Sequence, residues 1–451
     1  IVCDANNVSN CGYTLDEPTP EDFPGRALHK VTVDEQGAVV GAVHDMEITY
    51  DEHCVATLSC RTCRFRIKAY RAVHDDTLKT VICESEGRRP RTEYHICSLC
   101  GRESLTLTDG QGDTLRVLLE KATQANIMME NTFRPDPISW ELVGSRRDLS
   151  DCLIISDIGW AAQGDMSGKT FDCDIIIPDL RASMGRTILG MRFDDTTYQI
   201  NQTSGLTVVL PEGMEYVGCY GSVFFSQVAE LTLPETLRCL SDGALGGYAG
   251  ETLVLPASIT YFPDDGFQMQ NLRSLTIKGA HYEISPYLWC PNLEELICLG
   301  TFDVFRGFGT PCKIEEFTVP AGVRIISSYA FSRMTSLKSL ILPEGVTEIE
   351  RQAFEDCKNL SEIVLPVSLE KIGGNAFKDC DALTRVEMRG VKEIGSSAFM
   401  SCDTLEEVVV GEVLTKVGNG AFSYCSALKK INLPATTVVA DDAFRGCTSL
   451  Q

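Results

Sequence analysis

One phrase recurs five times between residues 337 and 447, and it constrains the fold more than any other feature of the chain. Each copy runs Leu-x-x-Leu-x-Leu, with other aliphatic residues or Met at some of these places, and then passes to an Ala-Phe pair. The pairs are Ala353-Phe354, Ala376-Phe377, Ala398-Phe399, Ala421-Phe422 and Ala443-Phe444. A cysteine follows each Phe by three residues, and these are Cys357, Cys380, Cys402, Cys425 and Cys447, so the period is 22 or 23 residues.

A period of about 20–29 residues with this leucine spacing is typical of a leucine-rich-repeat solenoid, in which each repeat forms one coil. Weaker copies of the strand extend back to about residue 205, for example Leu206–Leu210 and Leu253–Leu255. We therefore predict for residues 205–451 an α/β-type leucine-rich-repeat solenoid of mostly short parallel strands with loops or short helices. It should contain about eleven coils, with leucines pointing inward and x positions on a concave face.

The recurring cysteines of the coils have a structural interpretation. Cys is small and apolar enough to be buried, and Met334 takes the equivalent place after Phe331. We expect packing rather than chemistry from them. Stacked coils lie about 5 Å apart, so disulfides between neighbouring coils remain geometrically feasible.

The first 103 residues carry a second pattern. Eight of the 20 cysteines and five of the six histidines lie in this segment. The phrase Ala-Val-His-Asp occurs twice, and each copy is followed by a single Cys and a Cys-x-x-Cys pair. Cys-x-x-Cys with a further Cys and His is a tetrahedral zinc ligand set. We predict two small zinc-ribbon-like modules with structural zinc, whose ligands are His44, Cys54, Cys60, Cys63, His74, Cys83, Cys97 and Cys100.

Two other interpretations of these cysteines stay open. Cys60, Cys63, Cys97 and Cys100 could form one shared site, or the cysteines could form disulfides in an oxidising compartment. His53 or His95 could replace a histidine of the predicted set. Zinc itself is inferred from ligand softness.

Residues 104–204 are predicted to be a connector or an N-terminal cap of the solenoid. Leu115, Leu118, Leu119 and Ala122 have roughly helical spacing, so we expect one helix near residues 113–131. The chain begins at Ile1, and Gln451 falls where a new strand would begin, so we expect it to be a piece of a longer protein truncated at the C-terminus.

Charge and motifs exclude some classes of function. The formal net charge is −23, which disfavours nonspecific binding to nucleic acid or anionic membranes. No apolar run is long enough to span a membrane. Gly-x-Ser-x-Gly, His-Glu-x-x-His and Gly-x-Gly-x-x-Gly are absent from the sequence, and Gly164–Thr170 is one residue short of a phosphate-binding loop. We therefore expect no enzymatic activity.

The repeat phrase, written Leu360–Cys380 as LSEIVLPVSLEKIGGNAFKDC, resembles the leucine-rich-repeat family typified by the BspA surface antigen. The resemblance covers about residues 205–451. It implies a surface-displayed or secreted protein of a host-associated bacterium or mucosal protist, with a role in adhesion. The N-terminal Cys/His units resemble, more loosely, modules that accompany such repeats.

The leading hypothesis is a non-catalytic protein that binds another protein or a ligand on a host or neighbouring cell. The predicted binding surface consists of the x positions on successive strands: Lys338, Ser339, Ser361, Glu362, Thr384, Arg385, Glu406, Glu407, Lys429 and Lys430. The alternative is an intracellular regulator whose arginine-rich zinc modules contact nucleic acid while the solenoid recruits a protein.

Overall fold

The structure is a computed structural model, and the chain forms two compact units. It describes residues 2–4, 30–33, 39–43, 46–50, 55–60, 66–71, 78–98, 100–131, 134–135, 140–145, 147–161, 169–192, 200, 205–218, 224–241, 244–260, 267–279, 282–284, 288–308 and 310–451. The first unit contains Ile1–Cys83 and Thr92–Thr106. The second contains Glu84–Arg91 and Leu107–Gln451.

The first unit is built from short antiparallel strands. One three-stranded sheet has the order β1-β3-β2 and another has the order β4-β5-β6, while β7 pairs with β8. The strands are β1 (Val2–Asp4), β2 (Lys30–Val33), β3 (Val39–Val43), β4 (Met46–Tyr50), β5 (Val55–Cys60), β6 (Arg66–Arg71), β7 (Leu78–Cys83), β8 (Arg91–Ile96) and β9 (Glu103–Thr108).

The second unit has an antiparallel strand pair where the sequence predicted a helix. Residues Thr114–Lys121 form the strand β10, which pairs antiparallel with β13 (Cys152–Trp160). The prediction was wrong here: Leu115, Val117 and Leu119 are buried with the two-residue period of a strand, whereas Leu118, which belonged to the helical pattern, is on the other face.

The helix of this region is short and begins later. It is α1 (Gln124–Met128), and the Thr123 hydroxyl accepts the Asn126 N–H while the Asn126 amide oxygen accepts the Thr123 N–H. These reciprocal hydrogen bonds cap the first turn. The segment before the coils also contains β11 (Met129–Asn131), β12 (Arg134–Pro135) and the π-helical turn η2 (Trp140–Gly144), while α3 (Arg181–Met184) follows the first strand of the coils.

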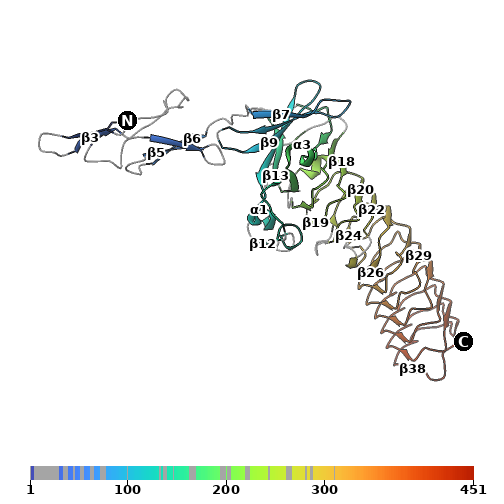
Figure 1. The fold of residues 1–451 in the computed structure, drawn as a ribbon. Helices are drawn as coiled ribbons and strands as arrows, with labels where there is room; N and C mark the ends of the chain where they lie inside the picture. The colour runs from blue at the N-terminus through green and yellow to red at the C-terminus, as the bar shows by residue number, and fades with distance from the viewer. Residues whose placement is uncertain are drawn as a thin grey trace. The chain divides into compact units, whose positions relative to one another are not determined.

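The coils stack through rows of parallel strands, which Figure 1 shows along the green-to-red part of the ribbon. The first row holds β14 (Ile175–Ile176), β16 (Leu206–Val209), β18 (Val228–Thr232), β20 (Thr252–Leu255), β22 (Ser274–Ile277), β25 (Glu295–Cys298), β27 (Glu316–Thr318), β29 (Ser339–Ile341), β31 (Glu362–Val364), β33 (Arg385–Met388), β35 (Glu407–Val410) and β37 (Lys430–Ile431). The parallel pairing thus begins before residue 205, the predicted start of the solenoid.

A second row of shorter strands runs along another side of the coils. It holds β15 (Thr187–Met191), β17 (Tyr216–Val217), β19 (Cys239–Leu240), β23 (Tyr282–Ile284), β26 (Phe302–Phe305), β28 (Ile325–Ile326), β30 (Glu348–Ile349), β32 (Lys371–Ile372), β34 (Glu393–Ile394), β36 (Lys416–Val417) and β38 (Val438–Val439). At a third side lie β21 (Phe267–Gln268) and β24 (Leu288–Trp289), and the turn η3 (Phe225–Gln227) precedes β18.

The Ala-Phe pairs continue this third side in the regular coils. The Phe354 N–H donates to the Ala376 carbonyl of the next coil at 2.7 Å, and the Phe377 N–H donates to the Ala398 carbonyl at the same distance. The rings of Phe331, Phe354, Phe377, Phe399, Phe422 and Phe444 stack on one another, with centroids 4.9–5.4 Å apart. One phenyl ring per coil therefore forms a continuous aromatic column.

The recurring cysteines lie beside this column. Each Sγ donates a hydrogen bond to the carbonyl of the Phe in the preceding coil, for example Cys357 to Phe331 at 3.0 Å and Cys402 to Phe377 at 3.0 Å. Burial raises the pKa of the Cys357 thiol to about 12. These contacts agree with the packing role expected from the sequence, and they add a hydrogen-bonding role for the thiol.

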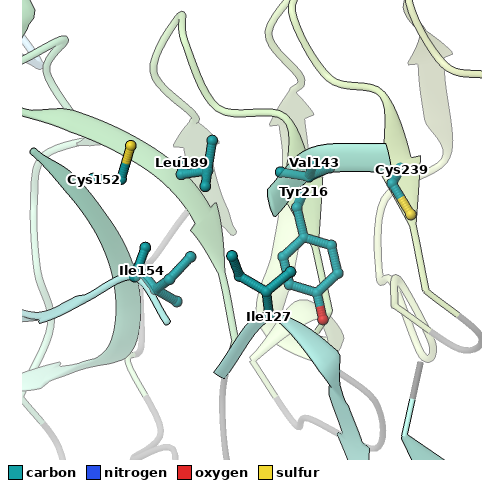
Figure 2. Close-up of a cluster of buried hydrophobic side chains, with 8 residues drawn as sticks. Ile127, Val143, Cys152, Ile154, Leu189, Tyr216 and Cys239 are labelled. Atoms are coloured by element: carbon teal, nitrogen blue, oxygen red, sulfur yellow. The ribbon is translucent and has the colours of Figure 1, made fainter. Parts of the chain in front are cut away.

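A hydrophobic cluster joins the segment before the coils to the first second-row strands. Figure 2 shows Ile127 and Val143 near the ring of Tyr216, and the same buried cluster includes Ile154, Leu189 and Cys239. The backbone leaves room for that ring only because position 190 is a glycine, where a Cβ would lie 2.7 Å from Tyr216 Cδ1. This segment therefore shares its core with the solenoid.

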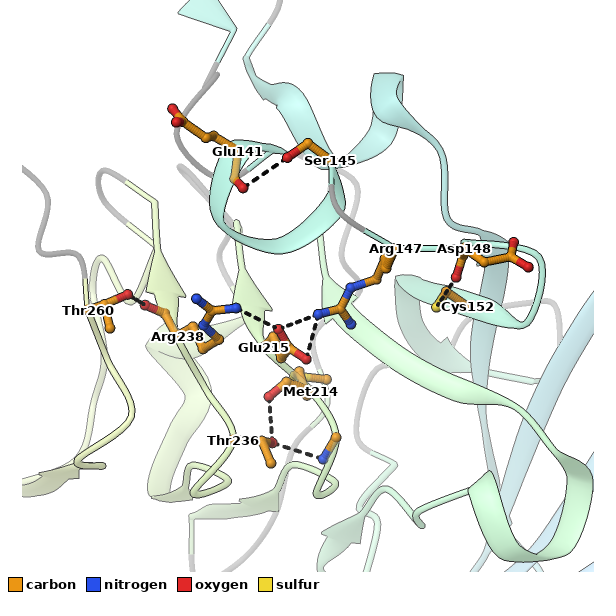
Figure 3. Close-up of polar contacts among 11 residues, drawn as sticks. Glu141, Ser145, Arg147, Asp148, Cys152, Met214, Glu215, Thr236, Arg238 and Thr260 are labelled. Atoms are coloured by element: carbon orange, nitrogen blue, oxygen red, sulfur yellow. Dashed lines mark hydrogen bonds and ion pairs between the residues drawn. The ribbon is translucent and has the colours of Figure 1, made fainter.

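An ion-pair network lies next to this cluster. In Figure 3, Glu215 lies between two arginines. Arg147 Nη2 donates to both carboxylate oxygens of Glu215, at 2.9 and 2.8 Å, and Arg238 Nη1 is 3.6 Å from Oε2. Glu215 is mostly buried, so the two arginines compensate a carboxylate that has lost much of its water.

Candidate functional site

The first-row strands present alternate side chains to solvent. In β20, Leu253 and Leu255 are buried while Thr252 and Val254 are exposed. Because the strands are parallel and in register, the outward residues of successive strands form columns along the solenoid. We call the outward side chains of the first row, with the residue before each strand, the first-row face.

The ten residues predicted as the binding surface all lie on this face, and none of them is buried. They belong to two adjacent three-stranded sheets, β27-β29-β31 and β33-β35-β37. Within these sheets the register aligns Ser339 with Glu362, and Arg385 with Glu407 and Lys430 in turn. Their role in binding stays a prediction.

Many of the predicted charges are paired with a charge on the neighbouring coil. Arg385 Nε lies 2.9 Å from Glu407 Oε2, and Lys429 Nζ lies 2.8 Å from Glu406 Oε2. The hydrogen bond that Arg385 donates to Glu407 is the main reason that the pKa of the Arg385 guanidinium is raised above its ordinary value. This part of the face is therefore close to electrically balanced.

The second row carries its own column of charges. Glu348, Lys371, Glu393 and Lys416 occupy the same register position in four successive strands, so the sign alternates from coil to coil. Lys371 Nζ lies 2.5 Å from Glu348 Oε1, and Lys416 Nζ lies 3.8 Å from Glu393 Oε2. We call these four residues the alternating column.

Sequence reasoning missed a column of the first-row face. The third residue of each strand from β20 to β31 is β-branched and points outward: Val254, Thr276, Ile297, Thr318, Ile341 and Val364. The prediction concentrated on the charged positions at the start of each strand. The two-residue period of a strand, applied to these same segments, would have found the column.

Half of the predicted zinc ligands lie outside the described residues: His44, Cys54, Cys63 and His74. Cys60 is the last residue of β5, where only the backbone is described. Cys97 is buried directly after β8, and His95 Nε2 in that strand is 2.8 Å from Thr106 Oγ1.

Cys97 and Cys100 share one tight loop. The Gly101 N–H donates to the Cys97 carbonyl at 2.8 Å, and the Cys97 N–H donates to the Arg102 carbonyl at 2.9 Å. Gly101 has a φ of 70°, which favours glycine. The Cys-x-x-Cys pair thus occurs in a compact turn.

The structure does not bring Cys83 to this loop. In the β7–β8 ladder Cys83 is level with Thr92, five residues before Cys97. At about 3.4 Å per residue this is roughly 17 Å, whereas two sulfurs on one zinc ion each lie about 2.3 Å from the metal. The second zinc module was predicted to combine Cys83 with Cys97 and Cys100. This distance shows that Cys83 cannot share one zinc ion with the other two. No group of three or more possible metal ligands occurs among the described residues. The shared four-cysteine site and zinc binding itself stay predictions.

The stacked parallel rows define a leucine-rich-repeat β-solenoid. The sequence profile of the BspA-type leucine-rich-repeat region matches residues 197–306 and 305–429, in six copies. The chain belongs to this family of BspA-type leucine-rich-repeat proteins. Membership implies a protein-interaction or adhesion-type role.

Solved structures with similarity to the chain are bacterial leucine-rich-repeat proteins. A leucine-rich cell surface protein from Faecalibacterium prausnitzii is 18% identical, with 63% of this chain and 91% of that chain covered and a TM-score of 0.34. A protein from Bacteroides ovatus is 16% identical, with 65% and 96% covered and a TM-score of 0.33. One from Eubacterium ventriosum is 18% identical, with 66% and 90% covered and a TM-score of 0.35. Because these TM-scores are low, family membership rests on the sequence profile.

A comparison with curated proteins gave no match. None of the helices in the described parts of the chain has the length and apolar character needed to cross a membrane.

Proposed function

We propose that the chain is a non-catalytic adhesion or protein-interaction protein that binds its partner through the first-row face. The observation that carries the proposal is the in-register stacking of exposed side chains on successive strands, which makes an extended surface that no single loop could offer. The partner is another protein or a ligand on a host or neighbouring cell, and the chain acts at the cell surface or after secretion. Family membership supports this location.

The test compares adhesion of the full chain with that of a face variant. Beads coated with either protein are applied to cultured epithelial cells and to bacterial cells. In the face variant, Lys338, Glu362, Arg385, Glu406 and Lys429 are replaced by alanine. These side chains are exposed, so the fold should survive, which circular dichroism will check.

We expect the face variant to lose most of the adhesion. A control variant replaces Glu348, Lys371, Glu393 and Lys416 of the alternating column by alanine and should adhere like the unmodified chain. Unchanged adhesion of a folded face variant would place the binding site in the loops or in the N-terminal modules instead.

A further inference from the structure

The first-row face from β20 to β31 exposes an aliphatic surface. Four residues of the β-branched column are well exposed, namely Val254 (44%), Ile297 (38%), Ile341 (46%) and Val364 (57%). Thr276 and Thr318 lie between them in the register and keep the column branched at Cβ throughout. Each of these side chains has one rotatable bond or two, so covering the column costs little side-chain entropy.

Carboxylates line one side of this column. Glu295, Glu316 and Glu362 are exposed at the first position of their strands, two residues before Ile297, Thr318 and Val364. None of these three glutamates takes part in an ion pair found among the described residues. Within the part of the chain that the structure describes, one side chain donates a hydrogen bond to them: Ser274 Oγ lies 2.7 Å from Glu295 Oε2.

Two cations that lie directly before strands of this region, Arg273 and Lys338, are paired with other carboxylates. Arg273 contacts Glu251 at 3.4 Å and Glu294 at 2.7 Å, and Lys338 contacts Glu315 at 2.7 Å. The carboxylates in these pairs belong to residues directly before the strands. The pairs therefore leave the charges of the glutamates at the first strand position unneutralised. The region from β20 to β31 consequently keeps a net negative charge beside its aliphatic column.

The coils from β33 to β37 differ in the outward β-branched residue and in the pairing of the carboxylates. Glu387 takes the place of the aliphatic residue in β33, and it pairs with Arg385 at 3.2 Å. Asn432 follows Ile431 in the coil of β37. In β35, Val409 keeps the β-branched position, but Glu407 two residues before it is paired with Arg385 at 2.9 Å. Carboxylates outside ion pairs therefore accompany the β-branched column in β25, β27 and β31, and this combination does not continue in β33, β35 and β37.

We propose that the β20–β31 part of the first-row face binds a cationic, aliphatic-rich segment of a partner protein. Lysine or arginine side chains of that segment pair with Glu295, Glu316 and Glu362, and its aliphatic side chains cover the β-branched column. Charge complementarity selects this occupant, since an anionic segment would be repelled by the unpaired carboxylates. The inference rests on the proposed function and names the chemistry of its partner.

The experiment uses the full chain and a short fluorescent peptide of alternating Lys and Val, with binding followed by fluorescence anisotropy. A Lys-Ser peptide carries the same charge without aliphatic side chains, and a Glu-Val peptide reverses the charge. We expect the Lys-Val peptide to bind best, the Lys-Ser peptide to bind more weakly and the Glu-Val peptide not to bind. Raising the salt concentration should weaken binding of the Lys-Val peptide only in part, because the aliphatic contacts are not screened.

Two matched charge variants locate the site. Replacing Glu295, Glu316 and Glu362 by glutamine should raise the Kd for the Lys-Val peptide about tenfold, the size expected for three exposed charge pairs. Replacing Glu348, Glu370 and Glu393 by glutamine removes the same net charge on the second row and should change the Kd less than about twofold. Equal effects of the two triple substitutions would mean that only the overall charge attracts the peptide, and this would overturn the proposal.

A third variant tests the aliphatic contribution. Replacing Ile297, Ile341 and Val364 by threonine should weaken binding of the Lys-Val peptide and leave binding of the Lys-Ser peptide unchanged. No binding of the Lys-Val peptide, or equal loss for both peptides, would overturn the proposal. These results are distinguishable from failure of the proposed function, because the peptide assay needs no natural ligand and the face variant of the bead assay leaves Glu295, Ile297 and Glu316 unchanged.

Discussion

Removing one ring from the middle of the aromatic column tests how the coils support one another. Phe377 stacks on Phe354 at 4.9 Å and on Phe399 at 5.0 Å, with nearly parallel rings. Phe377→Leu keeps a large apolar side chain in the core and removes both ring contacts. Aromatic pairs contribute about 0.5–1.5 kcal/mol each beyond burial, so two contacts amount to about 1–3 kcal/mol.

Phe444 provides the matched control at the last ring of the column. It stacks only on Phe422, at 5.4 Å, and it is half-buried. Phe444→Leu should therefore cost about 0.5–1.5 kcal/mol, from one contact. Phe399→Leu, with a neighbour on each side, should resemble Phe377→Leu.

The assay uses the buried thiols as local reporters. Cys402 Sγ donates to the Phe377 carbonyl, so alkylation of Cys402 requires that this coil opens. We expect iodoacetamide to label Cys402 about 5- to 150-fold faster in Phe377→Leu than in the unmodified chain, as measured by peptide mass spectrometry. Urea unfolding followed by circular dichroism gives the total loss in the free energy of unfolding. If Phe377→Leu and Phe444→Leu cost the same, stacking between neighbouring rings does not stabilise the coils.

Two further predictions concern the cysteines. Burial raises the pKa of the Cys357 thiol from 9.0 to about 12, so the unfolded chain loses this proton at a lower pH than the folded chain. The contribution of this thiol to the free energy of unfolding should be fully present below pH 9 and fall by about 1.4 kcal/mol per pH unit between pH 9 and 12. Urea unfolding across this range should show a shallower fall with pH for Cys357→Ala than for the unmodified chain. Equal slopes of unfolding free energy against pH would contradict the assignment. For the N-terminal segment we propose structural zinc at the shared four-cysteine site, and elemental analysis of protein purified without added metal should find one ion per chain. Absence of metal together with loss of free thiols would instead indicate disulfides.

The coil architecture could be predicted because one local rule is repeated. The 22- or 23-residue spacing of Phe354, Phe377 and Phe399 indicates that these rings occupy the same place in successive coils, and the structure stacks them. The helix near residues 113–131 was predicted wrongly because this stretch occurs once and is not repeated. A single stretch with leucines at ambiguous spacing has no repeat to decide between a strand and a helix, and its pairing with β13 decided for the strand.

The candidate site could be predicted only in part. The exposure of Lys338 and Glu406 followed from the strand pattern, but their pairing with Glu315 and Lys429 depends on the register between coils. The packing of the segment before the coils could not be predicted, since Ile127 and Tyr216 are far apart in sequence and meet through tertiary packing. No local pattern encodes such a contact.

Because the sign of charge alternates from coil to coil in the alternating column, removing one coil and removing two coils have different consequences. Glu348, Lys371, Glu393 and Lys416 are stacked so that each carboxylate has an ammonium group as its neighbour along the axis. Deleting the single coil that carries Lys371 would place Glu348 next to Glu393, where like charges repel. Deleting the coils of both Lys371 and Glu393 would place Glu348 next to Lys416 and preserve the attraction. A solenoid built in this way can be shortened or lengthened by pairs of coils more readily than by one.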